Sequence, residues 1–425
     1  MKKVLPFLFV ILSFSLSAQE KTFIRDFTYN ASDLDSKVSC RAIAKKELRS
    51  LLLDEIGSYV ESESILTTSE VGDKFSQDFV ENISTISAGI TKFKILEETW
   101  NGKTFWMKAS ITIDKKSIEE SLKQLIADRQ KIKELEQTKQ KLETSEKEIA
   151  RLNKELEENK SANLEEIAEK YNAEIKMLVA IDYLESGNDK AFSEDYAGAI
   201  VDYTIAIKSN PDYAVAYYNR GIAYKALGEY NAAIADYTTA IRLDPDYAVA
   251  YNNRGAAYDG LGENNTAISD FTTVIRLDPD YADAYYNRGN AYSDLGDYNT
   301  AKADYTTAIR LDPDYATAYN NRGIAYSDLG EYNTAIADYT TAIRLDPDYA
   351  DAYVGRGNAY VDLGEYNTAI ADYTTAIRLD TDYALAYSNR GVAKENAGLP
   401  YCSDYQRACE LGKKECCEWY NDQCR

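Results

Sequence analysis

The sequence predicts a mainly α-helical protein: an α-solenoid of helix pairs, preceded by a small α/β domain and a long charged helix. Two observations predict the solenoid. A segment of 34 residues recurs in close copies, and a glycine inside each copy recurs at the same interval of 34 residues. Repeats of this length stack as units that bury their apolar faces only against their neighbours. The copies open at Tyr213, Tyr247, Tyr281, Tyr315 and Tyr349.

Composition narrows the classes of function. The chain has 425 residues, 45% of them hydrophobic, which is enough for two or three folded domains. Its formal net charge of −22 argues against nucleic acid as a partner, because phosphate binding needs clustered Lys and Arg. The chain has no histidine, so Ser-His-Asp catalysis and His-ligated metal sites are excluded.

Residues 1–18 have the layout of a signal peptide. Lys2 and Lys3 precede an apolar run, and small residues close it at Ser17 and Ala18. The run is shorter than the ~20 apolar residues that a membrane-spanning helix needs. We therefore expect an exported bacterial protein, periplasmic or secreted, without a transmembrane segment after the signal is removed.

Residues 19–116 predict the small α/β domain. Apolar residues from Ala42 to Val60 recur at helical spacing, and a second, shorter helix is expected from Ser76 to Ile86. Two runs with strand character, Ile90–Thr99 and Thr104–Ile113, then flank Asn101 and Gly102.

The loop of this hairpin sets its register. A three-residue loop, 101–103, pairs Phe93 with Ile111 and Ile95 with Ala109, which places the apolar side chains on one face. We therefore predict that loop, with Gly102 in the left-handed conformation.

Three other residues of this domain invite a functional interpretation. Trp100 and Trp106 flank the hairpin tip, where cross-strand packing is favoured over a ligand platform. Cys40 is expected to be a buried thiol rather than a reactive one. The helix-plus-hairpin pattern ending in WNGKTFWMKASITID resembles the N-terminal domain of flagellar assembly protein T and a domain of some outer-membrane lipoproteins.

Residues 117–178 are rich in Lys, Glu, Leu and Ile and predict a long charged helix. Leu135, Leu142, Ile149 and Leu156 recur every seven residues and form one apolar position of a heptad. The second heptad position is apolar at Leu125 and Ile132 and polar after that. Two interpretations stay open: a coiled-coil homodimer through 117–160, and a single helical spacer. The apolar pattern that restarts at Leu164 is expected to cap the first repeat.

Each repeat, within residues 179–383, predicts two helices. Tyr217, Gly221 and Tyr224 lie on one face of the first helix, and Leu227-Gly228 ends it. We expect Asn231 to cap the second helix, which then carries Ala233, Tyr237 and Ala240 on one face. Small residues at Gly221 and Ala233 indicate a close helix approach, and Asp244-Pro245-Asp246 makes the next turn. Among the copies, Lys302 stands where an Ile recurs.

These units resemble the tetratricopeptide repeat (TPR) family in their period, in the aromatic–Gly–aromatic of the first helix, in the Ala–aromatic–Ala of the second, and in the closing Pro. The resemblance implies a right-handed superhelix whose first helices line its concave side. It covers most of a seventh first helix and six units: 180–213, 214–247, 248–281, 282–315, 316–349 and 350–383.

One pairing is expected inside each repeat. An Arg of the first helix and an Asp of the second recur at a fixed offset, and we predict an ion pair that fixes register more than it adds stability. The arginines are Arg220, Arg254, Arg288, Arg322 and Arg356; the aspartates are Asp236, Asp270, Asp304, Asp338 and Asp372.

The resemblance places the outward positions of the first helices in a groove that binds a partner. Asn side chains there are suited to the backbone of an extended peptide, and Tyr adds contact area. The alternative is a solvated face that binds nothing specific. The candidate groove residues are Tyr218, Asn219, Asn252, Asn253, Asp259, Tyr286, Asn287, Asn290, Asp294, Asn320, Asn321, Asp328, Asn358 and Asp362. The members of the family that bind chaperone tails hold the terminal carboxylate of the tail with a Lys-rich clamp. Only Lys225 lies near this face, so this class of partner is disfavoured.

Residues 384–425 predict capping helices rich in cysteine: Cys402, Cys409, Cys416, Cys417 and Cys424. In an exported protein this density indicates disulfides, with a four-cysteine zinc site as the alternative. The turn ACELGKKECC resembles cysteine-rich helical-repeat proteins of bacterial secretions. That resemblance implies a bridge from Cys409 to Cys416 or Cys417, leaving Cys402–Cys424 as the remaining pair.

The favoured function is an exported protein–protein interaction scaffold whose concave groove holds a protein segment, one of basic character if the acidic face selects its partner. The alternative is a glycan or cell-wall binding module, because Tyr lies beside Asn and Asp. An enzyme with its site in residues 19–116 is the weakest class, since nothing there pairs a nucleophile with a base. We expect no cofactor and no metal.

Overall fold

The computed structural model describes residues 20–31, 35–62, 92–114, 144–145, 147–152, 154–155 and 164–424. These fall into two compact units, 1–216 and 217–425, which we describe separately. The predicted signal peptide, the helix expected from Ser76 to Ile86 and most of the charged helix lie outside the described residues.

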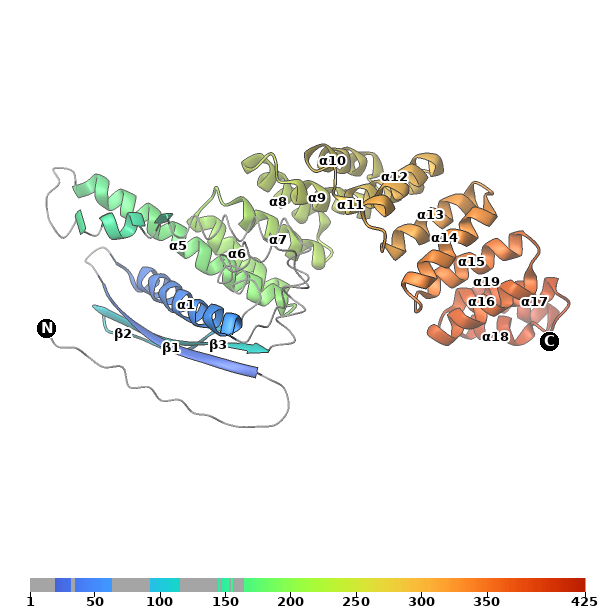
Figure 1. Cartoon of the computed structure of the whole chain (residues 1–425), viewed down its shortest axis with the longest axis horizontal. Helices are drawn as coiled ribbons and strands as arrows, with labels where there is room; N and C mark the ends of the chain where they lie inside the picture. The colour runs from blue at the N-terminus through green and yellow to red at the C-terminus, as the bar shows by residue number, and fades with distance from the viewer. Residues whose placement is uncertain are drawn as a thin grey trace. The chain divides into compact units, whose positions relative to one another are not determined.

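A three-stranded antiparallel sheet and one long helix form the small α/β domain (Figure 1). The strands are β1 (Glu20–Asn30), β2 (Lys92–Trp100) and β3 (Thr104–Asp114), with β3 in the centre. Helix α1 (Lys37–Ser62) covers one face of the sheet. The helix and the hairpin were predicted, whereas β1 was missed.

Away from the loop, the hairpin register is the predicted one. Phe93 pairs with Ile111 and Ile95 with Ala109, and Gly102 has a φ of +90°. A bulge between Ile95 and Glu97 was not expected. It shifts the strand by one residue, so that Trp100 pairs with Phe105 on the face that packs against α1. The three-residue loop 101–103 would have paired Trp100 with Thr104, so that part of the prediction was wrong.

The tryptophans and Cys40 have structural contacts. The Trp100 ring lies 6.2 Å from that of Phe105, and Trp106 Nε1 donates to Asp26 Oδ2 at 3.2 Å. Cys40 is fully buried, and burial together with the Asp35 carboxylate raises the pKa of its thiol to about 11. These contacts agree with the packing interpretation of all three residues.

Helix α5 (Leu164–Phe192) runs through the predicted boundary at residue 178 without a break. Its first half packs on the α/β domain: Ile167, Tyr171 and Ile175 share a buried cluster with Ile43 of α1 and with Ile149. Tyr171 also donates a 2.6 Å hydrogen bond to Asp35 Oδ1. Ile149, one position of the predicted heptad seam, is therefore buried within the chain, and the homodimer stays a prediction.

The second half of α5 is the first helix of the first repeat, and α6 (Tyr196–Ser209) is its partner. Asp182 of α5 stands where the later repeats carry a fully buried alanine, such as Ala216 and Ala250. Lys45 of α1 pairs with Asp182, and Arg49 of α1 pairs with Glu185. The α/β domain thus covers the end of the first repeat, a role expected for residues 164–178 alone.

The second unit consists of helix pairs in chain order (Figure 1). Its first helices are α7 (Ala214–Ala226), α9 (Ala248–Gly260), α11 (Ala282–Asp294), α13 (Ala316–Asp328), α15 (Ala350–Asp362) and α17 (Ala384–Asn396). The second helices are α8 (Tyr230–Leu243), α10 (Asn264–Leu277), α12 (Tyr298–Leu311), α14 (Tyr332–Leu345), α16 (Tyr366–Leu379) and α18 (Cys402–Glu410), and α19 (Lys414–Gln423) closes the chain.

Each pair is built as the repeat pattern predicts, with one exception. A Cβ at Gly221 would lie 2.7 Å from Cε1 of Tyr237, so only glycine allows the helices to approach this closely. Gly228, with φ +78°, ends α7. The expected cap at Asn231 was wrong: the N-cap is Glu229, without a side-chain hydrogen bond. The chain re-enters the helix directly after Gly228, so Asn231 already lies in the first turn.

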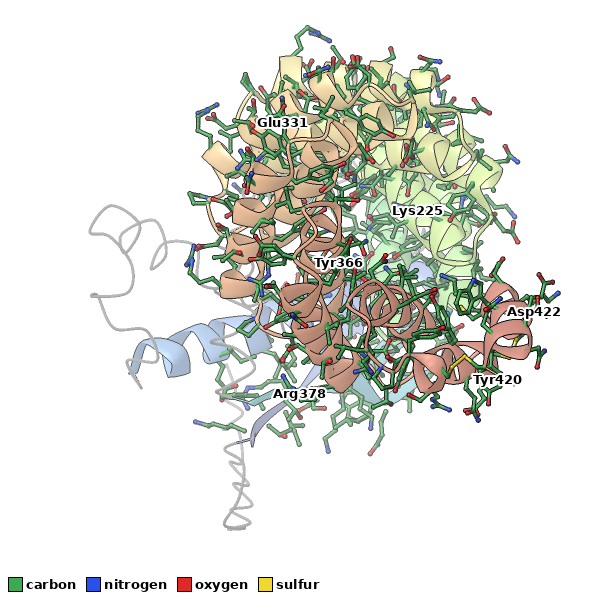
Figure 2. All side chains as sticks on the ribbon, turned by 90° about the vertical axis from the view of Figure 1, so that its right-hand side faces the viewer. Lys225, Glu331, Tyr366, Arg378, Tyr420 and Asp422 are labelled. Carbon is green, nitrogen blue, oxygen red and sulfur yellow. A yellow bond between two sulfur atoms is a disulfide. The ribbon has the colours of Figure 1, made fainter. Side chains whose placement is uncertain are left out.

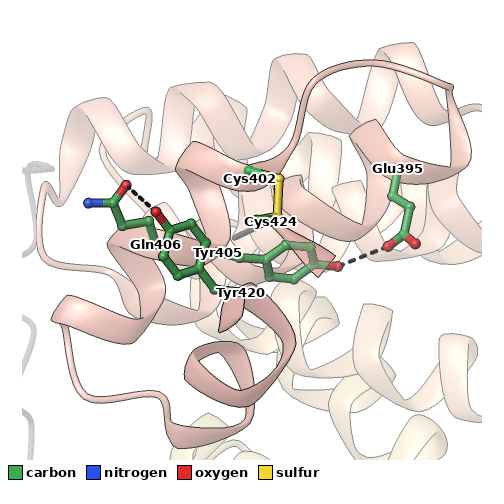
Figure 3. The surroundings of a disulfide bond; sticks show 6 residues. All are labelled: Glu395, Cys402, Tyr405, Gln406, Tyr420 and Cys424. Carbon is green, nitrogen blue, oxygen red and sulfur yellow. Dashed lines mark hydrogen bonds between the residues drawn. A yellow bond between two sulfur atoms is a disulfide. The ribbon is translucent and has the colours of Figure 1, made fainter. Parts of the chain in front are cut away.

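The C-terminal cysteines form two disulfides, Cys402–Cys424 and Cys409–Cys417, whereas Cys416 is a buried free thiol. The disulfide prediction is confirmed, and the zinc alternative is wrong because four of its candidate ligands are oxidised. Figure 3 shows the first bridge beside Tyr405, which donates to Glu395, and Tyr420, which donates to Gln406.

Candidate functional site

The predicted Arg–Asp pair is present in each of the five repeats. In the unit 282–315, Arg288 donates from Nε to Asp304 Oδ2 and from Nη2 to Asp304 Oδ1, both at 2.8 Å. The same two bonds, at 2.7–2.8 Å, recur at Arg220, Arg254, Arg322 and Arg356. These bonds raise the pKa of Arg288, because they favour its charged form.

Two further features of the Arg–Asp pair were not predicted from the sequence. Nη1 of Arg288 donates to Thr272 Oγ1 of the preceding repeat at 3.1 Å, so the guanidinium also joins neighbouring repeats. The pattern extends to Arg390 and Asp404 at an offset of 14 residues instead of 16. The recurring Thr was visible in the sequence, but the changed offset hid Asp404.

The candidate groove residues lie together on successive first helices, where they bond to each other. Asn253 Nδ2 donates to Tyr218 OH, Asn287 Nδ2 to Asn252 Oδ1, and Asn321 Nδ2 to Tyr286 OH, each at 3.1 Å. We call this row of bonds, each joining a residue to the one 35 positions earlier, the asparagine ladder. Its amides are engaged within the protein, whereas the sequence had suggested that they were open to a peptide.

The tyrosines of the ladder pack within the array. The Tyr218 ring lies 6.0 Å from that of Tyr237 and 5.0 Å from that of Tyr247. Tyr286 repeats the arrangement with Tyr305 and Tyr315, at 6.0 and 4.9 Å. Their faces are therefore half-buried against neighbouring rings.

A second row of contacts ties the buried Tyr of the second helices to the same face. Tyr305 OH donates to Asn290 Oδ1 at 2.9 Å, and Tyr373 OH to Asn358 Oδ1 at 2.7 Å. Where Ile222 stands at the Asn position, the hydroxyl of Tyr237 is buried and has no partner among the described residues. Asn290 and Asn358 thus hold the second helix as well as lining the face.

Carboxylates at the ends of the first helices are the most accessible candidates. Asp294, Asp328 and Asp362 are exposed, and each is the last residue of its helix. A carboxylate there faces the negative end of the helix dipole, so a bound cation would be favourable. Asp259 is half-buried, and burial together with the Asp294 carboxylate raises its pKa.

The remaining candidates differ in exposure. Asn219 is half-buried. Asn320 was expected to point outward, but it is only 4% exposed, because α13 and α15 approach closely there. Lys225, labelled in Figure 2, is half-buried, and burial lowers its pKa. Lys302, the departure from the repeated Ile, pairs with Glu331 at 3.1 Å.

The comparisons with known proteins identify the repeats. Models described as "TPR repeat" match residues 187–228, 260–296, 289–330, 325–363 and 357–398, and models described as "Tetratricopeptide repeat" match 214–247 and 236–269. Residues 187–398 are tetratricopeptide repeats. A comparison with curated protein sequences gives no match.

Solved TPR structures resemble parts of the chain. MamA is 30% identical and aligns with 39% of this chain and 96% of its own, with a TM-score of 0.37. YrrB, described as "a TPR protein with an unusual peptide-binding site", is 25% identical over 44% and 96%, with a TM-score of 0.38. A tetratricopeptide repeat protein from Parabacteroides merdae is 23% identical over 57% and 98%, with a TM-score of 0.47.

None of the described helices is both long and apolar enough to cross a lipid bilayer. Among the described residues, no group of His, Cys, Asp and Glu is arranged to hold a metal ion.

Proposed function

We propose that the TPR array is an exported protein-interaction scaffold whose first-helix face binds a basic, extended segment of a partner protein, in the cell envelope or outside the cell. The observation that carries this proposal is the row of carboxylates Asp294, Asp328 and Asp362 beside the asparagine ladder. They are exposed and repeat with the spacing of the helices, so they offer equally spaced anionic contacts to a long ligand.

Charge supports a basic segment. The chain carries a net charge of −22, and burial and Asp294 already disfavour the ionised form of Asp259. A Lys or Arg placed between these two carboxylates would relieve their repulsion and lower the pKa of Asp259. Exposed apolar side chains at Ile222 of α7, Ile324 of α13 and Val392 of α17 add contact area on first helices of the array.

Two arguments support the other parts of the proposal. The disulfides Cys402–Cys424 and Cys409–Cys417 agree with export, because disulfides persist in oxidising compartments. Tyr218 and Tyr286 have their ring faces packed on other tyrosines, which favours a protein segment over a glycan, since a sugar needs a free aromatic face.

A peptide-selection experiment tests the proposal. The mature chain is screened against a random displayed library of dodecapeptides, and enriched peptides are measured by calorimetry. We expect Lys- and Arg-rich peptides, weaker binding at higher salt, and weaker binding by the double variant Asp328→Asn, Asp362→Asn. The control is Asp348→Asn, which removes an equally exposed charge from a loop between repeats.

The proposal fails if no peptide is enriched, or if Asp348→Asn lowers affinity as much as the double variant. Co-sedimentation with peptidoglycan, abolished by the same double variant, would favour the cell-wall function instead.

A further inference from the structure

The asparagine ladder is interrupted at one step. An Asn of the next first helix donates to Tyr218, Asn252 and Tyr286 in turn, always from 35 residues further along. The next acceptor in this series is Asn320, and the residue 35 positions after it is Gly355, which has no side chain to donate.

The interruption leaves a buried acceptor. Asn320 is only 4% exposed, and its Oδ1 has no hydrogen-bond partner among the described residues. Its Nδ2 is engaged, donating to Asn321 Oδ1 at 3.1 Å. A buried carbonyl without a donor is unfavourable, and it makes this position a site where a donor would be bound.

The following step of the ladder lacks an acceptor instead. Val354 stands at the acceptor position and needs no donor, and Asn389 turns to Asn358 Oδ1 at 2.8 Å. At position 355 the donor is missing, but its acceptor, Asn320, is still present. At the next step the donor, Asn389, has found another acceptor.

The place of the missing side chain is filled by the edge of the Tyr339 ring. A Cβ at residue 355 would lie 2.6 Å from Cε1 of Tyr339. The Tyr339 hydroxyl makes only a 3.4 Å contact with Ser327 Oγ, whereas Tyr305 and Tyr373 are held by asparagines at 2.9 and 2.7 Å. The hydroxyl of Tyr339 is thus held by a weaker hydrogen bond than those of Tyr305 and Tyr373.

We propose that Asn320 Oδ1 is a subsite for an amide N–H of the bound segment. The ligand supplies the donor that an Asn at position 355 would have supplied, and it displaces the edge of the Tyr339 ring as it enters. This inference rests on the proposed function, because it names the group that the bound protein segment places between α13 and α15. The N–H belongs either to the main chain or to an Asn or Gln side chain of the ligand.

A double-mutant cycle on the full mature chain tests the subsite. The probe is the tightest dodecapeptide from the library selection. Asn320→Leu keeps the shape of the side chain and removes the acceptor, and the matched control is Asn299→Leu, the same substitution at an exposed asparagine of α12, outside the first-helix face. We expect Asn320→Leu to weaken binding by about five- to tenfold and the control to change it much less.

Two sets of peptide variants locate the donor. One carries N-methyl groups at successive main-chain amides, and the other replaces each Asn or Gln by Ala. We expect one change in one set to weaken binding to the wild-type chain and to have no further effect on Asn320→Leu. Should Asn320→Leu unfold, as judged by circular dichroism, the smaller Asn320→Ala takes its place.

The outcomes separate the two proposals. If peptides bind and Asn320→Leu behaves like Asn299→Leu, or if no peptide change couples to residue 320, the subsite is wrong and the proposed function stands. If no peptide binds the wild-type chain, both proposals fail.

Discussion

Arg288 of α11 and Asp304 of α12 are joined by two parallel hydrogen bonds, and the same guanidinium reaches Thr272 of the preceding repeat. Its ring neighbour is Tyr285, 5.8 Å from the guanidinium carbon. One side chain therefore connects three helices. Asp304 is only 5% exposed, so removal of its partner leaves a buried carboxylate unpaired.

Arg288→Met should lower the free energy of unfolding by about 2 kcal/mol, less than the loss at a fully buried pair because Arg288 is partly exposed. Thermal and urea unfolding measure the loss. Asp304→Leu in the Arg288→Met background should recover most of it, since the unpaired charge is gone. An unchanged midpoint for Arg288→Met alone would contradict a role for the pair in stability.

Two tyrosines provide a matched pair of substitutions. Tyr305→Phe removes a hydroxyl that donates to Asn290, so we expect a loss of about 1 kcal/mol. Tyr237→Phe removes a buried hydroxyl that has no hydrogen-bond partner in the described part of the chain, and it should leave stability unchanged or raise it. The protein itself has Phe271 at the equivalent position, where Ala256 offers no acceptor. Equal losses in urea unfolding would contradict this assignment.

Burial and the neighbouring Asp294 carboxylate raise the pKa of Asp259 above that of an ordinary aspartate, which gives a pH-dependent prediction. The ionised carboxylate is disfavoured in the folded chain, so the folded state is penalised at neutral pH and the penalty disappears as pH falls below the unfolded pKa. Asp259→Asn should therefore raise stability at pH 7, by about 0.5 kcal/mol, and leave it unchanged near pH 3. Asp362→Asn, at an exposed carboxylate, is the control.

The Cys402–Cys424 bridge ties the end of α19 to the start of α18 across 22 residues. Replacing both cysteines by serine should destabilise this end by about 3 kcal/mol, as expected from the lost restraint on the unfolded chain. Hydrogen exchange of α19 would report the change. Cys416→Ser removes a thiol whose hydrogen bond goes to Ser388 Oγ, and it should leave both disulfides intact in non-reducing mass mapping.

The repeats could be predicted in detail because their information is local and recurs. Gly221 and Arg220 each act on a second-helix residue at a fixed offset of 16, so one correct repeat gives all the others. Alternation likewise gave the pairing of Phe93 with Ile111 and Ile95 with Ala109, but it could not show the bulge that shifts the register next to the loop.

Features that depend on distant pairing escaped prediction. Strand β1 lacks clear alternation, because Arg25 faces the helix side and Ile24 is exposed, and it is ordered by pairing with β3 some eighty residues later. The ladder was misjudged for a similar reason. The sequence shows that Asn253 and Asn287 lie on one helix face, but their bonds to Tyr218 and Asn252 depend on the stacking of neighbouring repeats.

Helix α5 has a mechanical consequence. Its first half shares the buried cluster of Ile43 and Ile149, and its second half pairs with α6, so one helix belongs to both the α/β domain and the first repeat. Tension applied to the sheet is carried along a continuous rod of 29 residues into that repeat. The ion pairs of Lys45 with Asp182 and of Arg49 with Glu185 add side-chain links between α1 and this helix.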